Sequence, residues 1–221
     1  MRSSVVCTLL AGIAALSPIA LAGPDWIEDG DAGSTLGEAQ VVVGVGQLSK
    51  IIGSLGSALG DPDYEDMYLI RVISPTTFRF DLSDAGFDTQ VWLFNVTQAN
   101  EAFGLLANDD TVEGSQSVLT NTATDNTGAM LTQPGIYALA ISGAGRVPVS
   151  RTGLIYHFTN STEISGPDGP GGLNPHSGWV GEGVTGEYRV DLIGCDFVAV
   201  PAPGVGLIAG AALLVGMRRR R

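Results

Sequence analysis

The stretch Asp61–Phe94 reads DPDYEDMYLIRVISPTTFRFDLSDAGFDTQVWLF, and this stretch decides the fold. It contains three short apolar-rich runs separated by Ser-Pro and Asp-Ala-Gly turns. In the middle run, Phe78 and Phe80 alternate with Arg79 and Asp81, so the apolar side chains fall on one face of an extended chain. Short alternating runs bounded by turn residues predict neighbouring β-strands.

The same pattern continues through a chain that is rich in glycine, with 31 Gly in 221 residues, and poor in charge. This composition favours a β-protein with many turns. The strands that we predict are residues 40–45, 47–60, 67–73, 76–82, 90–96, 117–119, 136–142, 153–158 and 188–193. Short strands with Gly/Pro turns indicate one all-β domain over residues 40–196, an antiparallel β-sandwich or jelly roll.

The N-terminal segment carries an export signal. Residues 1–22 combine Arg2, an apolar run and the small-x-small ending Ala20-Leu21-Ala22, which predicts a cleaved secretory signal peptide. Residues 23–39 are acidic and turn-rich and are expected to form an extended lead-in. Cleavage removes Cys7 and leaves Cys195 alone, so Cys195 either packs as a small apolar residue or pairs with another chain.

The C-terminal segment, residues 197–221, predicts a membrane anchor. Its uncharged apolar run, residues 204–217, would be about 21 Å long as a helix, shorter than the ~30 Å hydrocarbon core. A longer span beginning at Phe197 is interrupted by Pro201 and Pro203. The basic cluster at the end should stay on the cytoplasmic side and leave the domain outside. This cluster consists of Arg218, Arg219, Arg220 and Arg221.

The charge balance limits the choice of partners. The formal net charge is −12, and the folded part is more acidic still, because Arg2 and the C-terminal arginines lie in the end segments. Such a domain repels nucleic acid and anionic lipid surfaces. The acidity either attracts divalent cations or only keeps an exported protein soluble.

Three aspartates form the best candidate site. Asp88 begins a predicted strand, and Asp109 and Asp110 lie in the loop after Asn108, so the three carboxylates are expected to converge at one end of the sandwich. Calcium takes six to eight oxygen ligands, often from loop carboxylates. We therefore predict Ca²⁺ at Asp88, Asp109 and Asp110, with ordinary turn residues as the alternative.

A second acidic cluster, Asp61, Asp63 and Asp66, precedes the strand at residues 67–73. Further upstream, Asp29 and Asp31 flank a glycine and resemble a fragment of a metal-binding loop, but the full calcium-loop pattern is missing. We interpret this fragment as a solvated turn.

The Gly/Pro-rich stretch at residues 165–186 is predicted to be a long loop. It contains Trp179, which would either bind a carbohydrate through an exposed ring or pack against the sheet and hold the loop there. Trp92 alternates into the sheet and is expected in the core. The two histidines, His157 in a predicted strand and His176 in the loop, have no evident catalytic partner.

Motifs of catalysis are missing from the sequence. It has no G-x-S-x-G, H-E-x-x-H, P-loop or C-x-x-C pattern. A serine mechanism would need one of the two histidines beside a serine and an acid, and no spacing supports this. We therefore expect a protein that is not an enzyme.

The tail resembles a PEP-CTERM sorting signal, on the strength of the Pro201-x-Pro203 entry, the short apolar run and the terminal arginines. The match spans residues 200–221 and departs at Ala202, where the pattern has Glu. The resemblance implies an exosortase-type processing enzyme as partner, cleavage near the prolines, and transfer to the envelope or extracellular matrix. The alternative is a plain membrane anchor.

The body, roughly residues 40–192, resembles bacterial pre-peptidase C-terminal (PPC) domains. The residues that carry the resemblance are Asp61-x-Asp63-Tyr64, Met67–Val72, Phe87–Phe94, Asn108-Asp109-Asp110 and Pro134–Ile141. The resemblance implies a β-sandwich of jelly-roll type without catalysis, and some PPC domains bind calcium.

These observations predict an exported, surface-sorted, non-catalytic β-sandwich with a structural or adhesive role. A module that binds carbohydrate, such as an extracellular polysaccharide, is the alternative, and a secreted hydrolase is a third and weaker one.

Overall fold

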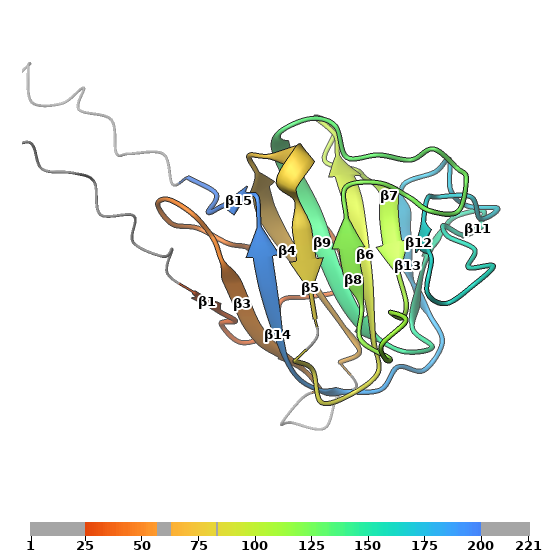
Figure 1. The fold of residues 1–221 in the computed structure, drawn as a ribbon, viewed down its shortest axis with the longest axis horizontal. Helices are drawn as coiled ribbons and strands as arrows, with labels where there is room; N and C mark the ends of the chain where they lie inside the picture. The colour runs from red at the N-terminus through yellow and green to blue at the C-terminus, as the bar shows by residue number, and fades with distance from the viewer. Residues whose placement is uncertain (1–24, 57–62, 83, 200–221) are drawn as a thin grey trace, which may run out of the picture.

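The computed structural model describes residues 25–56, 63–82 and 84–199, and these residues are almost entirely β-structure (Figure 1). The predicted signal peptide, Asp61, and the tail with Pro201, Pro203 and the four arginines lie outside the described residues. The described part has one short 3-10 helix, η1 (Pro75–Thr77), and contains no helix with the length and apolarity to cross a membrane.

Two large sheets and one small sheet build the part of the chain that the structure describes. In spatial order, the five-stranded sheet contains β1 (Trp26–Ile27), β3 (Lys50–Leu55), β14 (Gly186–Ile193), β5 (Arg79–Asp81) and β8 (Val118–Thr120). The seven-stranded sheet contains β12 (Ile164–Ser165), β7 (Ala102–Asn108), β6 (Thr89–Val96), β9 (Gly135–Gly143), β4 (Glu65–Val72) and β15 (Cys195–Asp196), with β2 (Gln40–Val41) also paired to β4. The small sheet contains β11 (Gly153–Leu154), β10 (Val147–Ser150) and β13 (His176–Val180).

The main core lies between the two large sheets, as expected for a β-sandwich. Alternate residues of each strand point into it, and the prediction that Phe78 and Phe80 share the buried face is confirmed. Val91 and Leu93 of β6 join the same core. Each fully buried side chain of this size stabilises the fold by about 1.5–3 kcal/mol relative to exposure, so this alternation explains much of why the two sheets stack.

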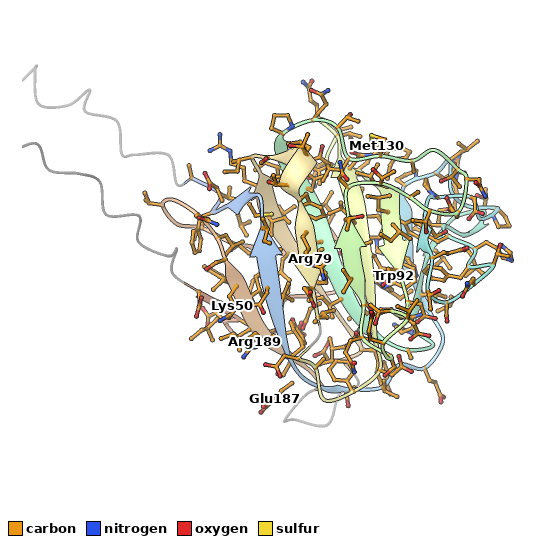
Figure 2. All side chains as sticks on the ribbon, in the orientation of Figure 1. Lys50, Arg79, Trp92, Met130, Glu187 and Arg189 are labelled. Carbon is orange, nitrogen blue, oxygen red and sulfur yellow. The ribbon has the colours of Figure 1, made fainter. Side chains whose placement is uncertain are left out.

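A second core covers the other face of the seven-stranded sheet. Trp92 and Phe94 of β6 point into it, opposite Val91 and Leu93, and the expectation that Trp92 lies in the core is confirmed. Trp92 is labelled in Figure 2. Its ring lies 5.5 Å from the Tyr156 ring and 6.1 Å from the Trp179 ring, measured between centroids. The small sheet is thus fixed to the sandwich by aromatic contacts.

Several local predictions were wrong. Strand β7 was not predicted, because nearly all of its residues are buried, and a strand covered on both faces shows no alternation. Strand β13 lies within the stretch predicted as a loop. The strand predicted at residues 153–158 ends at Leu154.

Strand orientation also departs from a purely antiparallel sandwich. Strand β1 pairs with β3 in parallel, and β2 pairs with β4 in parallel. Strands β1 and β2 have only two residues each, which is too few for a sequence pattern to reveal how they pair.

Cys195 is fully buried in the main core and is a free thiol. Burial, followed by the nearby Asp196 charge, raises the pKa of this thiol to about 12. A thiol in this setting packs as a small apolar side chain and is not poised to pair with another chain.

Candidate functional site

The structure brings Asp88, Asp109 and Asp110 together at one end of the sandwich. Asp88 immediately precedes β6, and Asp109 follows the end of β7. These two strands pair antiparallel, with Val91 opposite Asn108, so the start of one lies beside the end of the other. One carboxylate oxygen from each aspartate lies within 4.8 Å of the other two.

Hydrogen bonds from buried side chains hold the Asp109–Asp110 loop in place. Asn108 Nδ2 donates to the Asp110 carbonyl oxygen at 2.8 Å, and Ser117 Oγ donates to the Asp109 carbonyl oxygen at 2.8 Å. Asn108 Oδ1 accepts from the backbone amide of Val118 at 2.8 Å. Because the backbone is fixed in this way, the carboxylates converge without depending on mobile turns.

The electrostatics of this group show uncompensated negative charge. Burial, with smaller effects of the Asp110 and Asp88 charges, raises the pKa of Asp109 to about 6, although a hydrogen bond with Gln90 opposes the shift. Burial and the Asp110 charge also raise the pKa of Asp88. None of the ion pairs among the described residues includes these three aspartates.

Two buried acceptor atoms beside the group have no hydrogen-bond partner in the described structure: Asp88 Oδ1 and Gln90 Oε1. Gln90 was not named by the sequence analysis. The signal for it was present, since a glutamine next to an apolar strand run is a polar side chain at a buried position. Oxygen acceptors without donors are the ligands that a hard cation such as calcium prefers.

Two of the three residues predicted for the second acidic cluster come together with a further aspartate, and the third, Asp61, lies outside the described residues. Asp63 and Asp66 converge with Asp31, again with one oxygen each within 4.8 Å. The Asp29–Gly30–Asp31 fragment, interpreted as a solvated turn, therefore contributes one residue to a carboxylate group. Asp29 itself is exposed, and its backbone amide bonds to Gln40.

Trp179, the predicted carbohydrate-binding residue, is half-buried rather than displayed on a loop. Its indole N–H donates to the Ser34 carbonyl oxygen at 2.7 Å, and its ring packs edge-on against Trp92. This placement corresponds to the packing alternative, in which the tryptophan fastens the Gly/Pro-rich segment to the sheet.

The two histidines lie in different environments. His157 is exposed and lies beyond the end of β11, so its predicted place in a strand was wrong. His176 packs between Phe94 and Trp179, with ring centroids 5.4 and 5.1 Å away. Burial lowers the pKa of His176 to about 4.

This burial predicts a pH effect on stability. His176 has an ordinary pKa of 6.5 when unfolded and about 4 when folded. Above pH 6.5 the His176 imidazole is neutral in both the folded and the unfolded state, and it does not reduce the free energy of unfolding. Between pH 6.5 and 4 the unfolded state gains a proton that the folded state does not, so the free energy of unfolding falls as the pH falls. We expect His176 to reduce the free energy of unfolding by about 2–3 kcal/mol over this range. Thermal unfolding of wild type and His176→Asn, each at pH 7 and pH 4.5, checks this: the variant should lose less stability on acidification, and equal losses would contradict the assignment.

A scan against protein-family models and searches among curated proteins and solved structures gave no match. The class of protein is therefore defined by its own structure: an all-β, sandwich-like domain that carries two groups of converging carboxylates.

Proposed function

We propose that this chain is an exported, non-catalytic β-sandwich of jelly-roll type with a structural or adhesive role in the cell envelope or extracellular matrix. In this proposal it binds calcium at Asp88, Asp109 and Asp110. The observation that carries the calcium site is the convergence of three carboxylates, with one oxygen of each within 4.8 Å of the others; Oδ1 of Asp88 and Oε1 of the neighbouring Gln90 are buried and lack donors.

Export and sorting rest on the sequence. The signal peptide at residues 1–22 delivers the domain, and the PEP-CTERM-like tail passes it to an exosortase-type enzyme, at least transiently through an inner-membrane anchor. In the view of Figure 1, the last described strand, β15, lies on the side opposite β11 and β13. A tether that follows β15 would therefore leave the small sheet facing away from the membrane.

Calcium suits a scaffold of this kind because it removes an electrostatic cost. Three carboxylates close together repel one another, and burial makes the charged forms less favourable. A bound cation reverses both effects, and it stabilises the folded state by mass action because the unfolded chain has no such site. The three aspartates, Gln90 Oε1 and water molecules together supply enough oxygens for a six- to eight-coordinate ion.

Calcium titration of the purified protein tests this site. Wild type should show a calcium-dependent rise in melting temperature, and Asp109→Ala/Asp110→Ala should bind one calcium ion fewer per chain by calorimetry and show a smaller rise. Glu101→Ala/Glu113→Ala, which removes the same charge from two exposed side chains, is the matched control and should behave as wild type. An unchanged stoichiometry and an unchanged rise in the aspartate variant would overturn the site.

A further inference from the structure

Four carboxyl groups from separate segments meet at the edge of the sandwich where β1 joins β3. Glu28 directly follows β1, Asp31 lies in the turn after it, and Asp63 and Asp66 lie at the start of β4. One oxygen each of Asp31, Asp63 and Asp66 lies within 4.8 Å of the other two. This group shares no residue with the calcium site proposed above.

Backbone amides fix the outer carboxylates. Asp31 Oδ1 accepts from the amide of Gly33 at 2.7 Å, and Asp63 Oδ2 accepts from the amide of Gly56 at 3.0 Å. Asp63 accepts a further backbone hydrogen bond, from Glu65. The side chains are therefore already held in position before any ligand binds.

The carboxylate of Glu28 is held in the same manner. Its Oε1 accepts from the amide of Ala32 at 3.1 Å, and its Oε2 accepts from the amide of Ser54 on β3 at 2.8 Å. These bonds connect the segment after β1 to the neighbouring strand.

An independent observation at Asp66 points to a ligand. Asp66 is 0% exposed, and its Oδ2 accepts from the Tyr188 hydroxyl at 2.5 Å. The Tyr188 oxygen in turn lies 2.6 Å from the Tyr68 hydroxyl, so the tyrosine pair is fully used. Asp66 Oδ1 has no donor in the described structure, and a buried carboxylate oxygen without a donor is costly. The Glu28 carboxyl lies within hydrogen-bonding reach of the Asp66 side chain, but two carboxylates can bond to each other only when one of them holds a proton. A bound cation, or a proton shared with another carboxyl group, would stabilise this oxygen.

No positive side chain compensates the group. None of the ion pairs among residues 25–56, 63–82 and 84–199 includes any of the four carboxyls. Burial, then the charge of Glu28, raises the pKa of Asp66 to about 9. Burial is also the main cause of the raised pKa values of Glu28 and Asp63. The fold therefore maintains a concentration of negative charge that forms no ion pair with any of the residues that the structure describes.

Solvent reaches this group at Asp31, which is exposed, and Glu28 also lines a neighbouring cleft. Glu28, Ser54 and Tyr188 line this cleft of about 880 Å³ between β1, β3 and β14. Lys50 of β3 and Arg189 of β14 lie on the same side of the molecule (Figure 2), but Lys50 pairs with Asp191 and Arg189 pairs with Asp84, so both are directed to other carboxylates.

We propose that Asp31, Asp63 and Asp66 form a second divalent-cation site, suited to calcium, in which the free Asp66 Oδ1 is the innermost ligand and Glu28 contributes from behind. All the donors are oxygens, which favours calcium over zinc. The site goes beyond the proposed function and stands independently of it. It ties the segment after β1 to the start of β4 through an ion.

Calcium binding by the full chain tests the site, with Asp31→Asn/Asp63→Asn as the principal variant. Neither residue is fully buried, so the fold should survive, and the variant should lose one calcium ion per chain or bind it at least tenfold more weakly. Asp25→Asn/Asp29→Asn removes the same charge from two exposed residues of the same segment and should bind as wild type. The Asp109→Ala/Asp110→Ala variant should retain this ion, so that failure here and failure of the proposed calcium site are distinguishable.

Terbium, which replaces calcium and emits when neighbouring tyrosines are excited, supplies a readout specific to this site. We expect tyrosine-sensitised emission in wild type, quenched by excess calcium, and strongly reduced emission in Asp31→Asn/Asp63→Asn. The same calcium stoichiometry, affinity and terbium emission in wild type and that variant would overturn the proposal. It would also be overturned if wild type took up no ion here and its melting temperature instead fell as the pH rose through about 9, because Asp66 would then share a proton with Glu28.

Discussion

Trp92→Ala should lower the free energy of unfolding by about 3–5 kcal/mol, the range for removing a large aromatic side chain from a packed core. Trp92 is 1% exposed, lies in the middle of β6 and contacts both Tyr156 and Trp179. Its indole N–H also donates to Ser142 Oγ at 2.9 Å. The truncation would leave a cavity between the seven-stranded sheet and the small sheet, together with a hydroxyl that has lost its donor.

Urea denaturation followed by circular dichroism measures this loss. Leu173→Ala is the control, because Leu173 is 93% exposed and its truncation should change stability by less than about 0.5 kcal/mol. If Trp92→Ala cost less than about 1 kcal/mol, the second core would not hold the small sheet against the sandwich as the structure indicates.

Gly53→Ala has the second largest expected effect. Gly53 lies opposite Tyr188 in the pairing of β3 with β14. A Cβ atom at Gly53 would lie 2.6 Å from Tyr188 Cζ and 2.8 Å from Glu28 Oε2, closer than non-bonded atoms approach. The methyl group would displace the tyrosine that donates to Asp66, so overpacking and a broken buried hydrogen bond should together cost about 2–4 kcal/mol.

The matched control is Gly86→Ala. Gly53 and Gly86 both line the cleft between β1, β3 and β14. A Cβ atom at Gly86 would have nothing within 4 Å. Thermal unfolding should therefore separate the two variants by many degrees, with Gly86→Ala close to wild type. Equal melting temperatures would mean that the space above Gly53 is not filled by Tyr188.

How much of the fold can be predicted from the sequence depends on whether one face of a strand is exposed. The alternation of Phe78 and Phe80 with Arg79 identifies a strand and its buried face correctly. Strand β7 escapes prediction because its two faces are covered by the two cores, so the sequence AFGLLAN has apolar residues on both faces and only its last residue, Asn108, is polar. Strand β13 escapes because its five residues are embedded in Gly/Pro-rich sequence, and its tertiary contacts, not its local pattern, make it a strand.

The two groups of carboxylates also differ in how far the sequence predicts them. Asp88, Asp109 and Asp110 flank neighbouring antiparallel strands. Their convergence was predicted from Asp88 at the start of a predicted strand and from the loop after Asn108, although β7 itself was not predicted. The group of Asp31, Asp63 and Asp66 depends on the parallel pairing of β1 with β3, which carries Glu28 and Asp31 to the start of β4. A two-residue strand has no periodicity, and therefore the sequence suggested Asp61, Asp63 and Asp66 as a cluster without Asp31. Asp61 lies outside the described residues.

The central claim, that this sandwich is exported and sorted to the surface, is tested most directly by the intact mass of the native protein in fractionated cells. The account predicts a chain that begins after Ala22 and ends between Pro201 and Gly204, recovered from the envelope or the medium. A chain that still carries residues 1–22 in the cytoplasm would contradict export. A chain that keeps Arg218–Arg221 in the inner membrane would contradict sorting and leave a simply anchored domain.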